Sequence, residues 1–272
     1  DAAVVDSPLI RVRVSTEDFQ HSDAVSVTSY GPGSVSPTAA GRDYDIIFNE
    51  QLATDRFRLD FDVLNFSDTE ASAIVQLALE TAGLDLYAID ESSLGTATTV
   101  QTYDFSNSNM NGFTARNASP IIAVPAQMSA TPTGLLTRGF APGPGTPSDV
   151  IFGFWGMESN VPILADRLYR VDAVVATDAA EGSVADIPAF RLRINDTSLM
   201  YSRILNVDST GDAGLEPPTG GSRLYSIWFI PEPEIVGEDF IFSFDYLFVK
   251  DAGQAATIGT TLKSLTVKSY GL

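Results

Sequence analysis

Hydrophobic and polar residues alternate along most of this chain in short runs. The clearest run is Asp239–Val249 (DFIFSFDYLFV), in which five aromatic residues occupy every second position. Successive side chains of a β-strand point to opposite faces of the sheet, so this run predicts a core strand with one aromatic face. Comparable runs, separated by clusters of Gly, Pro, Asn and Asp, extend from Leu9–Val14 to Leu262–Tyr270. The pattern predicts an all-β protein built as an antiparallel sandwich.

The alternating pattern also contains an internal repeat. Arg56–Phe66 (RFRLDFDVLNF) matches the aromatic run at a constant shift in numbering, and the match keeps the aspartates Asp62 and Asp245. A Tyr-x-Ile-x-Phe strand precedes each copy, Tyr44–Phe48 in the first and Tyr225–Phe229 in the second. A short apolar strand closes each copy. The shared order of these elements indicates a duplication.

Two units follow from this repeat, residues 1–95 and residues 96–272. The segment before Tyr44 is long enough for only two or three strands, so the first unit is predicted to be an incomplete jelly-roll-like sandwich. A sandwich short of strands has an open edge that can pair with another chain. We expect the strand that carries Leu9, Ile10, Val12 and Val14 to complete such an edge, in its own chain or in a neighbouring molecule.

The second unit resembles the jelly-roll β-sandwiches of carbohydrate-binding modules and their galactose-binding-like relatives. The resemblance rests on Tyr103-Asp-Phe105 followed by Gly112-Phe113, on Phe190–Ile194, and on the closing strands Phe240–Val249 and Leu262–Tyr270. It implies a fold that commonly binds glycans, often with a structural Ca²⁺, and that also occurs in adhesins, sheaths and capsids. Such a fold does not by itself select one of these functions.

Composition narrows the possible partners. The 272 residues include 35 acidic and 16 basic side chains, a net charge of −19, which would repel a nucleic-acid backbone. A solvated acidic surface explains the charge most simply; a salty habitat or several Ca²⁺ sites are alternatives. No stretch approaches the ~18–20 apolar residues of a membrane span, so we expect no membrane insertion. The start at Asp1 without a Met resembles a mature secreted N-terminus, so we expect an extracellular or cell-surface location. The lack of cysteine is compatible with this, because a core of this size does not need disulfides.

Two tryptophans are the candidate ligand aromatics. Trp155 lies in the glycine-flanked GFWG, and Trp228 alternates out of phase with Tyr225, Ile227 and Phe229, so its side chain should face away from the core. Either ring could stack on a sugar. For Trp228 the alternative is a packed anchor at a subunit contact, which the apolar equivalent Ile47 in the first copy favours. For Trp155 the alternative is packing in the core.

Oxygen-bearing side chains suggest one metal site. Asn206, Asp208 and Asp212 place oxygen ligands at intervals along a segment that bends at Gly211, somewhat like a Ca²⁺ loop. The closing glutamate of an EF-hand is missing. A plain polar turn is the alternative, and no other cofactor is expected. Asp62 and Asp245 are expected to pair with an arginine of a neighbouring strand, such as Arg191 or Arg193; the alternative is a carboxylate that faces a glycan or a cation.

The sequence contains few features that indicate a catalytic function. His21 is the single histidine, and no Gly-x-Ser-x-Gly motif accompanies it. Paired carboxylates could hydrolyse glycosides, but no pair stands out among the acidic residues. Asn65, Asn117 and Asn195 begin N-glycosylation sequons, which matter only in a host that glycosylates secreted proteins.

We therefore expect a secreted, non-catalytic structural protein that self-assembles into an extracellular filament or surface layer. The alternative is a carbohydrate-binding module or adhesin that acts as a monomer.

Overall fold

The computed structural model describes twelve segments of the chain: residues 8–16, 21–28, 42–43, 46–47, 57–63, 90–116, 127–141, 150–177, 188–196, 201–208, 221–248 and 256–272. These segments hold strands and three short 3-10 helices, and none of their helices is long and apolar enough to cross a membrane. The all-β prediction is confirmed. The sequence pattern also predicts strands over Ile74–Leu79 and Leu84–Ile89, and both lie outside the described residues.

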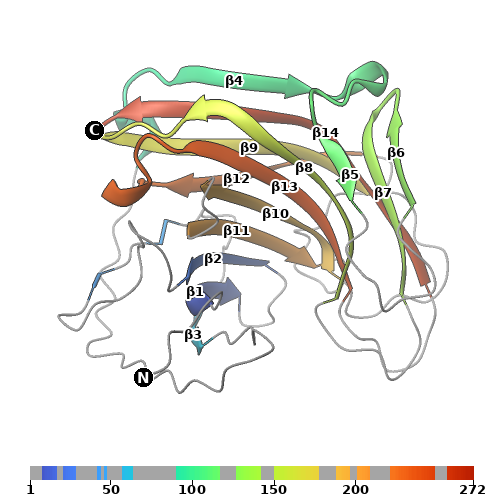
Figure 1. Cartoon of the computed structure of the whole chain (residues 1–272), viewed down its shortest axis with the longest axis horizontal. Helices are drawn as coiled ribbons and strands as arrows, with labels where there is room; N and C mark the ends of the chain where they lie inside the picture. The colour runs from blue at the N-terminus through green and yellow to red at the C-terminus, as the bar shows by residue number, and fades with distance from the viewer. Residues whose placement is uncertain are drawn as a thin grey trace, which may run out of the picture.

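Two antiparallel sheets pack as a sandwich (Figure 1). Sheet A has the order β3-β1-β2-β11-β10-β13-β8-β5. Its strands are β1 (Pro8–Thr16), β2 (His21–Thr28), β3 (Phe57–Val63), β5 (Thr114–Arg116), β8 (Val150–Pro162), β10 (Pro188–Asp196), β11 (Tyr201–Asp208) and β13 (Asp239–Phe248).

Sheet B has the order β12-β9-β14-β7-β6, and β4 also pairs with β14. Its strands are β4 (Thr98–Asp104), β6 (Gln127–Thr131), β7 (Gly134–Ala141), β9 (Arg167–Thr177), β12 (Arg223–Phe229) and β14 (Ala256–Gly271). The 3-10 helices are η1 (Glu91–Ser93), η2 (Ser106–Ser108) and η3 (Pro233–Ile235).

The aromatic strand lies in the core as predicted. Phe240, Phe242 and Phe244 of β13 are fully buried, and the Phe240 ring meets Tyr169 of the opposite sheet edge to face, with 5.2 Å between ring centroids. Such contacts add to the apolar surface that each ring removes from water. Ile46 and Phe61 of the first unit pack against the same core. The predicted boundary at residue 95 therefore separates two segments of sequence that share one core and one sheet.

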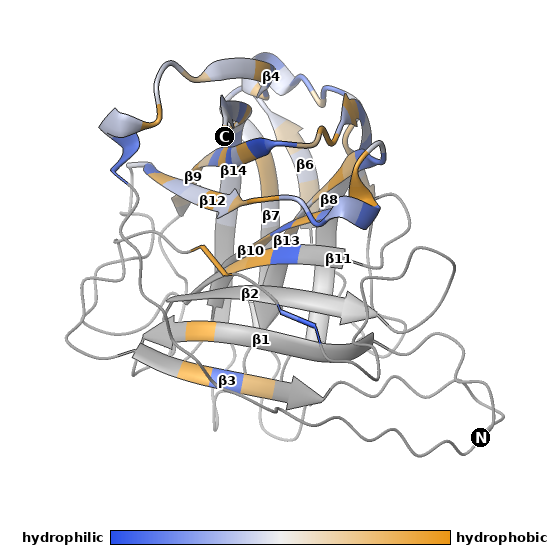
Figure 2. Cartoon of the chain, turned by 90° about the vertical axis from the view of Figure 1, so that its left-hand side faces the viewer, coloured by the Kyte–Doolittle hydropathy of each residue, from blue (hydrophilic) through white to orange (hydrophobic). Residues whose placement is uncertain are grey.

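Strand β1 has a partner on each side. Val12 pairs with Val25 of β2 and with Phe61 of β3, and Figure 2 shows β2, β1 and β3 continuing sheet A beyond β11. The expected completion of an edge by Leu9, Ile10, Val12 and Val14 thus takes place within the chain. An intermolecular contact through the edges of β1 would require one of these two pairings to open.

The duplication extends further than the sequence comparison indicated. Val12 pairs with Val25 in the first copy, and Leu192 pairs with Leu205 in the second. The interval in numbering from Val12 to Leu192 equals the interval from Val25 to Leu205. In the same way β1 pairs with β3 as β10 pairs with β13. The strands β2, β1 and β3 of the first copy therefore repeat β11, β10 and β13 of the second in identity of neighbours and in register.

The two copies join where each meets its own equivalent. In sheet A, Ala24 of β2 faces Ile204 of β11, and these two positions are separated by the same interval that relates the copies. In the other layer, Ile47 bridges to Trp228, its equivalent in the repeat. Antiparallel pairing of equivalent positions in both layers defines a pseudo-two-fold axis that crosses the sandwich. We call this junction, formed by β2 with β11 and by Ile47 with Trp228, the seam.

A buried arginine lies at the seam. Arg203 of β11 is 2% exposed, and its Nη2 donates to the carbonyl oxygens of Ile47 (3.3 Å) and Trp228 (3.1 Å). It thereby reaches from sheet A to one backbone carbonyl of each copy in the opposite layer. Hydrogen bonds from a charged donor are stronger than those between neutral groups. The seam is thus held by a side chain as well as by strand pairing.

Candidate functional site

Charged and aromatic side chains gather on the outer face of sheet B. Tyr225, Ile227 and Phe229 of β12 point into the core, so Trp228 and Ser226 point away from it, as the sequence predicted for Trp228. On β9, Asp172 lies opposite Ser226 and Arg170 lies opposite Trp228. Lys268 of β14 lies opposite Arg170 on its other side. We call the resulting group the outer-face cluster; it consists of Glu91, Arg170, Asp172, Ser226, Trp228, Lys268 and Tyr270.

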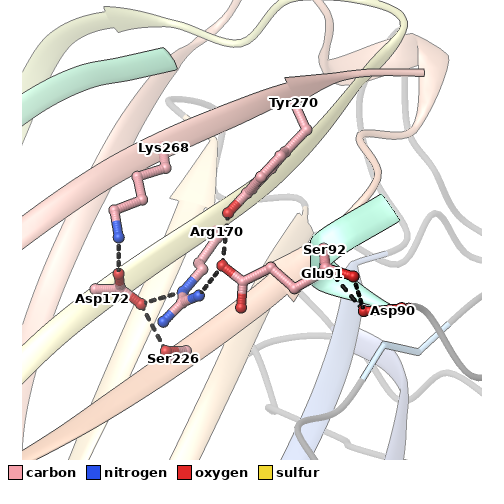
Figure 3. A network of polar contacts seen from close by, with 8 residues as sticks. All are labelled: Asp90, Glu91, Ser92, Arg170, Asp172, Ser226, Lys268 and Tyr270. Carbon is pink, nitrogen blue, oxygen red and sulfur yellow. Dashed lines mark hydrogen bonds and ion pairs between the residues drawn. The ribbon is translucent and has the colours of Figure 1, made fainter. Parts of the chain in front are cut away.

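Asp172 is the centre of this cluster (Figure 3). Its Oδ1 accepts hydrogen bonds from Arg170 Nε (2.6 Å) and Ser226 Oγ (2.6 Å), and its Oδ2 lies 2.8 Å from Lys268 Nζ. The side chain is 7% exposed. Burial alone would raise the pKa of Asp172, but hydrogen bonds from Lys268, Ser226 and Arg170 outweigh it and lower the pKa below its ordinary value. The carboxylate is therefore held ionised and immobile.

Glu91 approaches the cluster from η1. Its Oε1 accepts hydrogen bonds from Arg170 Nη1 (2.5 Å) and from the Tyr270 hydroxyl (2.9 Å), as Figure 3 shows. The preceding residue, Asp90, caps η1 by accepting from Ser92 N at 2.9 Å, which fixes the short helix from which Glu91 projects. The Glu91 side chain remains 53% exposed. It forms the solvent-facing side of the cluster.

Trp228 supplies the aromatic surface. Its ring is half-buried and stacks on Tyr270, with 5.6 Å between centroids and 22° between planes. The guanidinium carbon of Arg170 lies 5.1 Å from the centroid of the same ring, a cation–π contact. These contacts restrict the ring to one orientation. The packing alternative therefore describes much of the environment of Trp228, although the residue keeps part of its area in solvent.

The arrangement is suited to binding and is poorly suited to acid catalysis. A glycosidase acid needs a raised pKa so that it can hold a proton near neutral pH, whereas the pKa of Asp172 is lowered. By contrast, hydroxyl-rich ligands are recognised by rings flanked by fixed hydrogen-bonding groups. Lys268, whose side chain is 30% exposed, and Glu91 provide such groups beside Trp228.

Two of the predicted site residues are buried instead. Trp155 is 2% exposed in the core, where its Nε1 donates to the Leu136 carbonyl at 3.3 Å, so its prediction as a ligand aromatic is wrong and the packing alternative holds. Asn195 is 7% exposed within β10, between β11 and β13, which leaves no room for a glycan. Its prediction as a glycosylation site is wrong because the Asn195 side chain is buried in the folded chain.

The other predicted positions are tested only in part. Asn206 and Asp208 belong to β11 and not to a loop, because the strand continues to Asp208. Asp212, Asn65 and Asn117 lie outside the described residues. Within the described part of the chain, no three acidic or histidine side chains converge as a metal site would require. A Ca²⁺ site at this loop stays a prediction.

The strand register explains the two repeated aspartates. Asp245 of β13 lies directly opposite Arg191 of β10, and Asp62 of β3 lies opposite Arg11 of β1. Opposite charges at facing positions of an antiparallel pair stabilise a sheet. This backbone placement agrees with the expected pairing between each aspartate and an arginine of the neighbouring strand.

The pattern of residues in the sequence did not predict most of the outer-face cluster. Arg170 and Asp172 interrupt a strongly apolar strand at alternate positions, which is the signal that would have located them. Glu91 and Lys268 are far from them in the chain and have no distinctive sequence context. The ladder of β12, β9 and β14 brings Arg170, Asp172 and Lys268 together, and Glu91 reaches them from η1.

Comparisons with known proteins concern the fold. No protein-family model and no curated protein matches the chain. Solved structures that resemble it include the CBM22-1 xylan-binding domain from Paenibacillus barcinonensis Xyn10C, with 14% identity, a TM-score of 0.35, and coverage of 65% of this chain and 97% of that domain. The xylan-binding module CBM15 has 12% identity, a TM-score of 0.37, and coverage of 64% and 95%.

Proteins with other activities resemble the chain to the same degree. The K1 cleaved adhesin domain of Lys-gingipain from Porphyromonas gingivalis W83 has 13% identity and a TM-score of 0.36, with coverage of 65% of this chain and 99% of that one. A cyclase from Fischerella sp. TAU has 10% identity and a TM-score of 0.35, with coverage of 63% and 98%. The chain is thus similar to carbohydrate-binding modules, the class that its sequence pattern resembles, and equally to proteins of other functions.

Proposed function

We propose that the protein binds carbohydrate at the outer-face cluster and acts as a binding protein at the cell surface or outside the cell. The observation that carries this proposal is the partly exposed Trp228 ring, fixed by Tyr270 and Arg170 beside accessible polar groups of Glu91 and Lys268. A fixed ring loses little conformational entropy when a ligand binds. Flanking donors and acceptors can then select the hydroxyl pattern of a sugar.

The charges favour a neutral glycan. Within the cluster, Arg170 and Lys268 are already paired with Asp172 and Glu91, so no net positive charge remains for an acidic sugar. The chain as a whole carries a net charge of −19, which repels polyanionic polysaccharides. A neutral polysaccharide needs no positively charged site and is not repelled by the negative chain. We therefore assign uncharged, hydroxyl-rich glycans as the ligand class.

A direct test is the retardation of the purified full chain in native gels that contain neutral or uronate-rich polysaccharides. Retardation by a neutral polysaccharide is expected, with at least a tenfold loss of affinity in Trp228→Ala. Leu224→Ala is the matched control, because Leu224 is an exposed apolar residue of the same strand outside the cluster. Binding that survives Trp228→Ala, or that is lost equally in Leu224→Ala, would contradict the proposal.

Self-assembly into a filament or surface layer is a separate hypothesis. The sequence assigned it to the strand that carries Leu9, Ile10, Val12 and Val14, and it does not depend on glycan binding.

A further inference from the structure

The seam has the form of a two-fold interface between identical partners. His21–Val27 of β2 pair with Tyr201–Val207 of β11 in antiparallel register, and each strand meets the strand that it repeats. The same holds in the other layer for Ile47 and Trp228. In isologous interfaces of homodimers, likewise, a surface pairs with an equivalent surface. Here both surfaces belong to one chain.

The contacts across the seam do not depend on the two copies being in one molecule. Among the described residues they include the β2–β11 ladder, the Ile47–Trp228 bridge, the hydrogen bonds of Arg203, and ion pairs from Arg42 to Glu232 (3.0 Å) and Glu234 (2.7 Å). Each would form with the same geometry if the first copy came from a neighbouring molecule. The enthalpy of the seam is then nearly the same in both arrangements.

The chain between the copies is long enough for such an exchange. The segment 64–90 separates the end of β3 from the start of η1. A fully extended chain of this length could span about 90 Å at roughly 3.3 Å per residue. What favours the closed form is therefore chiefly the high effective concentration of the linked copy, and this advantage falls as protein concentration rises.

We propose that the seam is an exchangeable interface between copies of this chain: the β1–β3 segment of one molecule pairs with β11 and β12 of another. Reciprocal exchange produces a closed dimer, and one-way exchange produces an open chain of molecules. The partner is a second copy of the protein. This interface replaces the edge of β1 as the assembly surface, since both sides of β1 are occupied.

Cysteine cross-linking tests the proposal directly, because the chain contains no cysteine. Ala24 and Ile204 face each other across the seam. Facing residues of an antiparallel pair have Cα separations compatible with a disulfide. The variants Ala24→Cys and Ile204→Cys are mixed in equal amounts, refolded together from denaturant at increasing protein concentrations, and oxidised. Exchange is expected to yield disulfide-linked dimers that contain one molecule of each variant, in a fraction that rises with concentration.

Two controls make a negative result informative. The double variant Ala24→Cys/Ile204→Cys must close its disulfide within one chain at low concentration, which confirms the geometry. A mixture of Val174→Cys and Leu224→Cys, a facing pair on β9 and β12 of the second copy, should give no mixed dimer. Light scattering of untreated wild-type protein at high concentration should detect a species of twice 29.1 kDa or larger. Absence of mixed dimers at every concentration, with the double variant closed, would overturn the proposal whether or not the protein binds glycans.

Discussion

Two arginines contact the same residue, Trp228, from opposite sides of sheet B. Arg203 reaches it from the core and donates to its backbone carbonyl, while Arg170 lies on the outer face over its ring. Arg203 also binds the carbonyl of Ile47, whereas Arg170 binds the carboxylates of Asp172 and Glu91. The inner arginine joins main-chain atoms of the two copies, and the outer arginine organises side chains at the surface.

The difference shows how one side chain type serves two purposes. Arg203 is almost fully buried and the carbonyls that it binds are partly buried, so loss of its hydrogen bonds would leave these polar groups less well satisfied. Of the partners of Arg170, Asp172 is buried but Glu91 is more than half exposed, and water can replace part of what Arg170 provides to Glu91. The inner arginine should therefore matter mainly for stability, and the outer one for the shape and charge of the candidate site.

The largest expected effect is that of Arg203→Met. The substitution keeps much of the apolar stem but removes both hydrogen bonds to the Ile47 and Trp228 carbonyls, and we expect the free energy of unfolding to fall by about 2–4 kcal/mol. Urea denaturation followed by circular dichroism measures this. Arg170→Met is the matched variant and should cost less. Equal losses in the two variants would contradict the distinction between the inner and the outer arginine.

A smaller effect is expected for Asp172→Asn. The amide cannot serve Arg170, Lys268 and Ser226 as the carboxylate does, so the free energy of unfolding should fall by about 1–3 kcal/mol at neutral pH.

The pH dependence of this loss follows from the pKa of Asp172. That pKa lies below its ordinary value of 3.8 in the folded protein, so the unfolded chain binds the proton more readily. The contribution of the carboxylate is complete above the ordinary value and disappears as the pH falls through the folded pKa. Denaturation curves of wild type and Asp172→Asn should therefore converge below about pH 4. A constant difference down to about pH 2 would be inconsistent with the role assigned to this carboxylate.

The smallest effect is expected for Glu91→Gln. The Glu91 side chain is more than half exposed, so the loss of its charge should change the free energy of unfolding by less than about 1 kcal/mol. The change should vanish in about 1 M NaCl, where surface charges are screened. The loss in Asp172→Asn should persist in the same salt. An Asp172→Asn effect that vanished with that of Glu91→Gln would place both carboxylates in the same solvated environment.

Features that depend on neighbouring residues could be predicted from the sequence, whereas features that depend on residues distant in the chain could not. Alternation correctly predicted the buried face of β13 and the outward direction of Trp228, because strand geometry relates neighbours in the chain. It did not reveal that Trp155 is buried, since both faces of β8 carry apolar residues there. It also missed the equivalence of β1 with β10 and of β2 with β11, whose sequences have diverged but whose register has not.

Local periodicity and the comparison of two segments were enough to establish the all-β class, the aromatic core strand, the duplication, and the side of the strand on which Trp228 stands. They could not establish which strands are neighbours. Strand order depends on pairing between residues that are distant in the chain, such as Ala24 with Ile204. For that reason only the folded molecule distinguishes Arg203, buried at the seam, from Arg170, which lies over the Trp228 ring on the outer face.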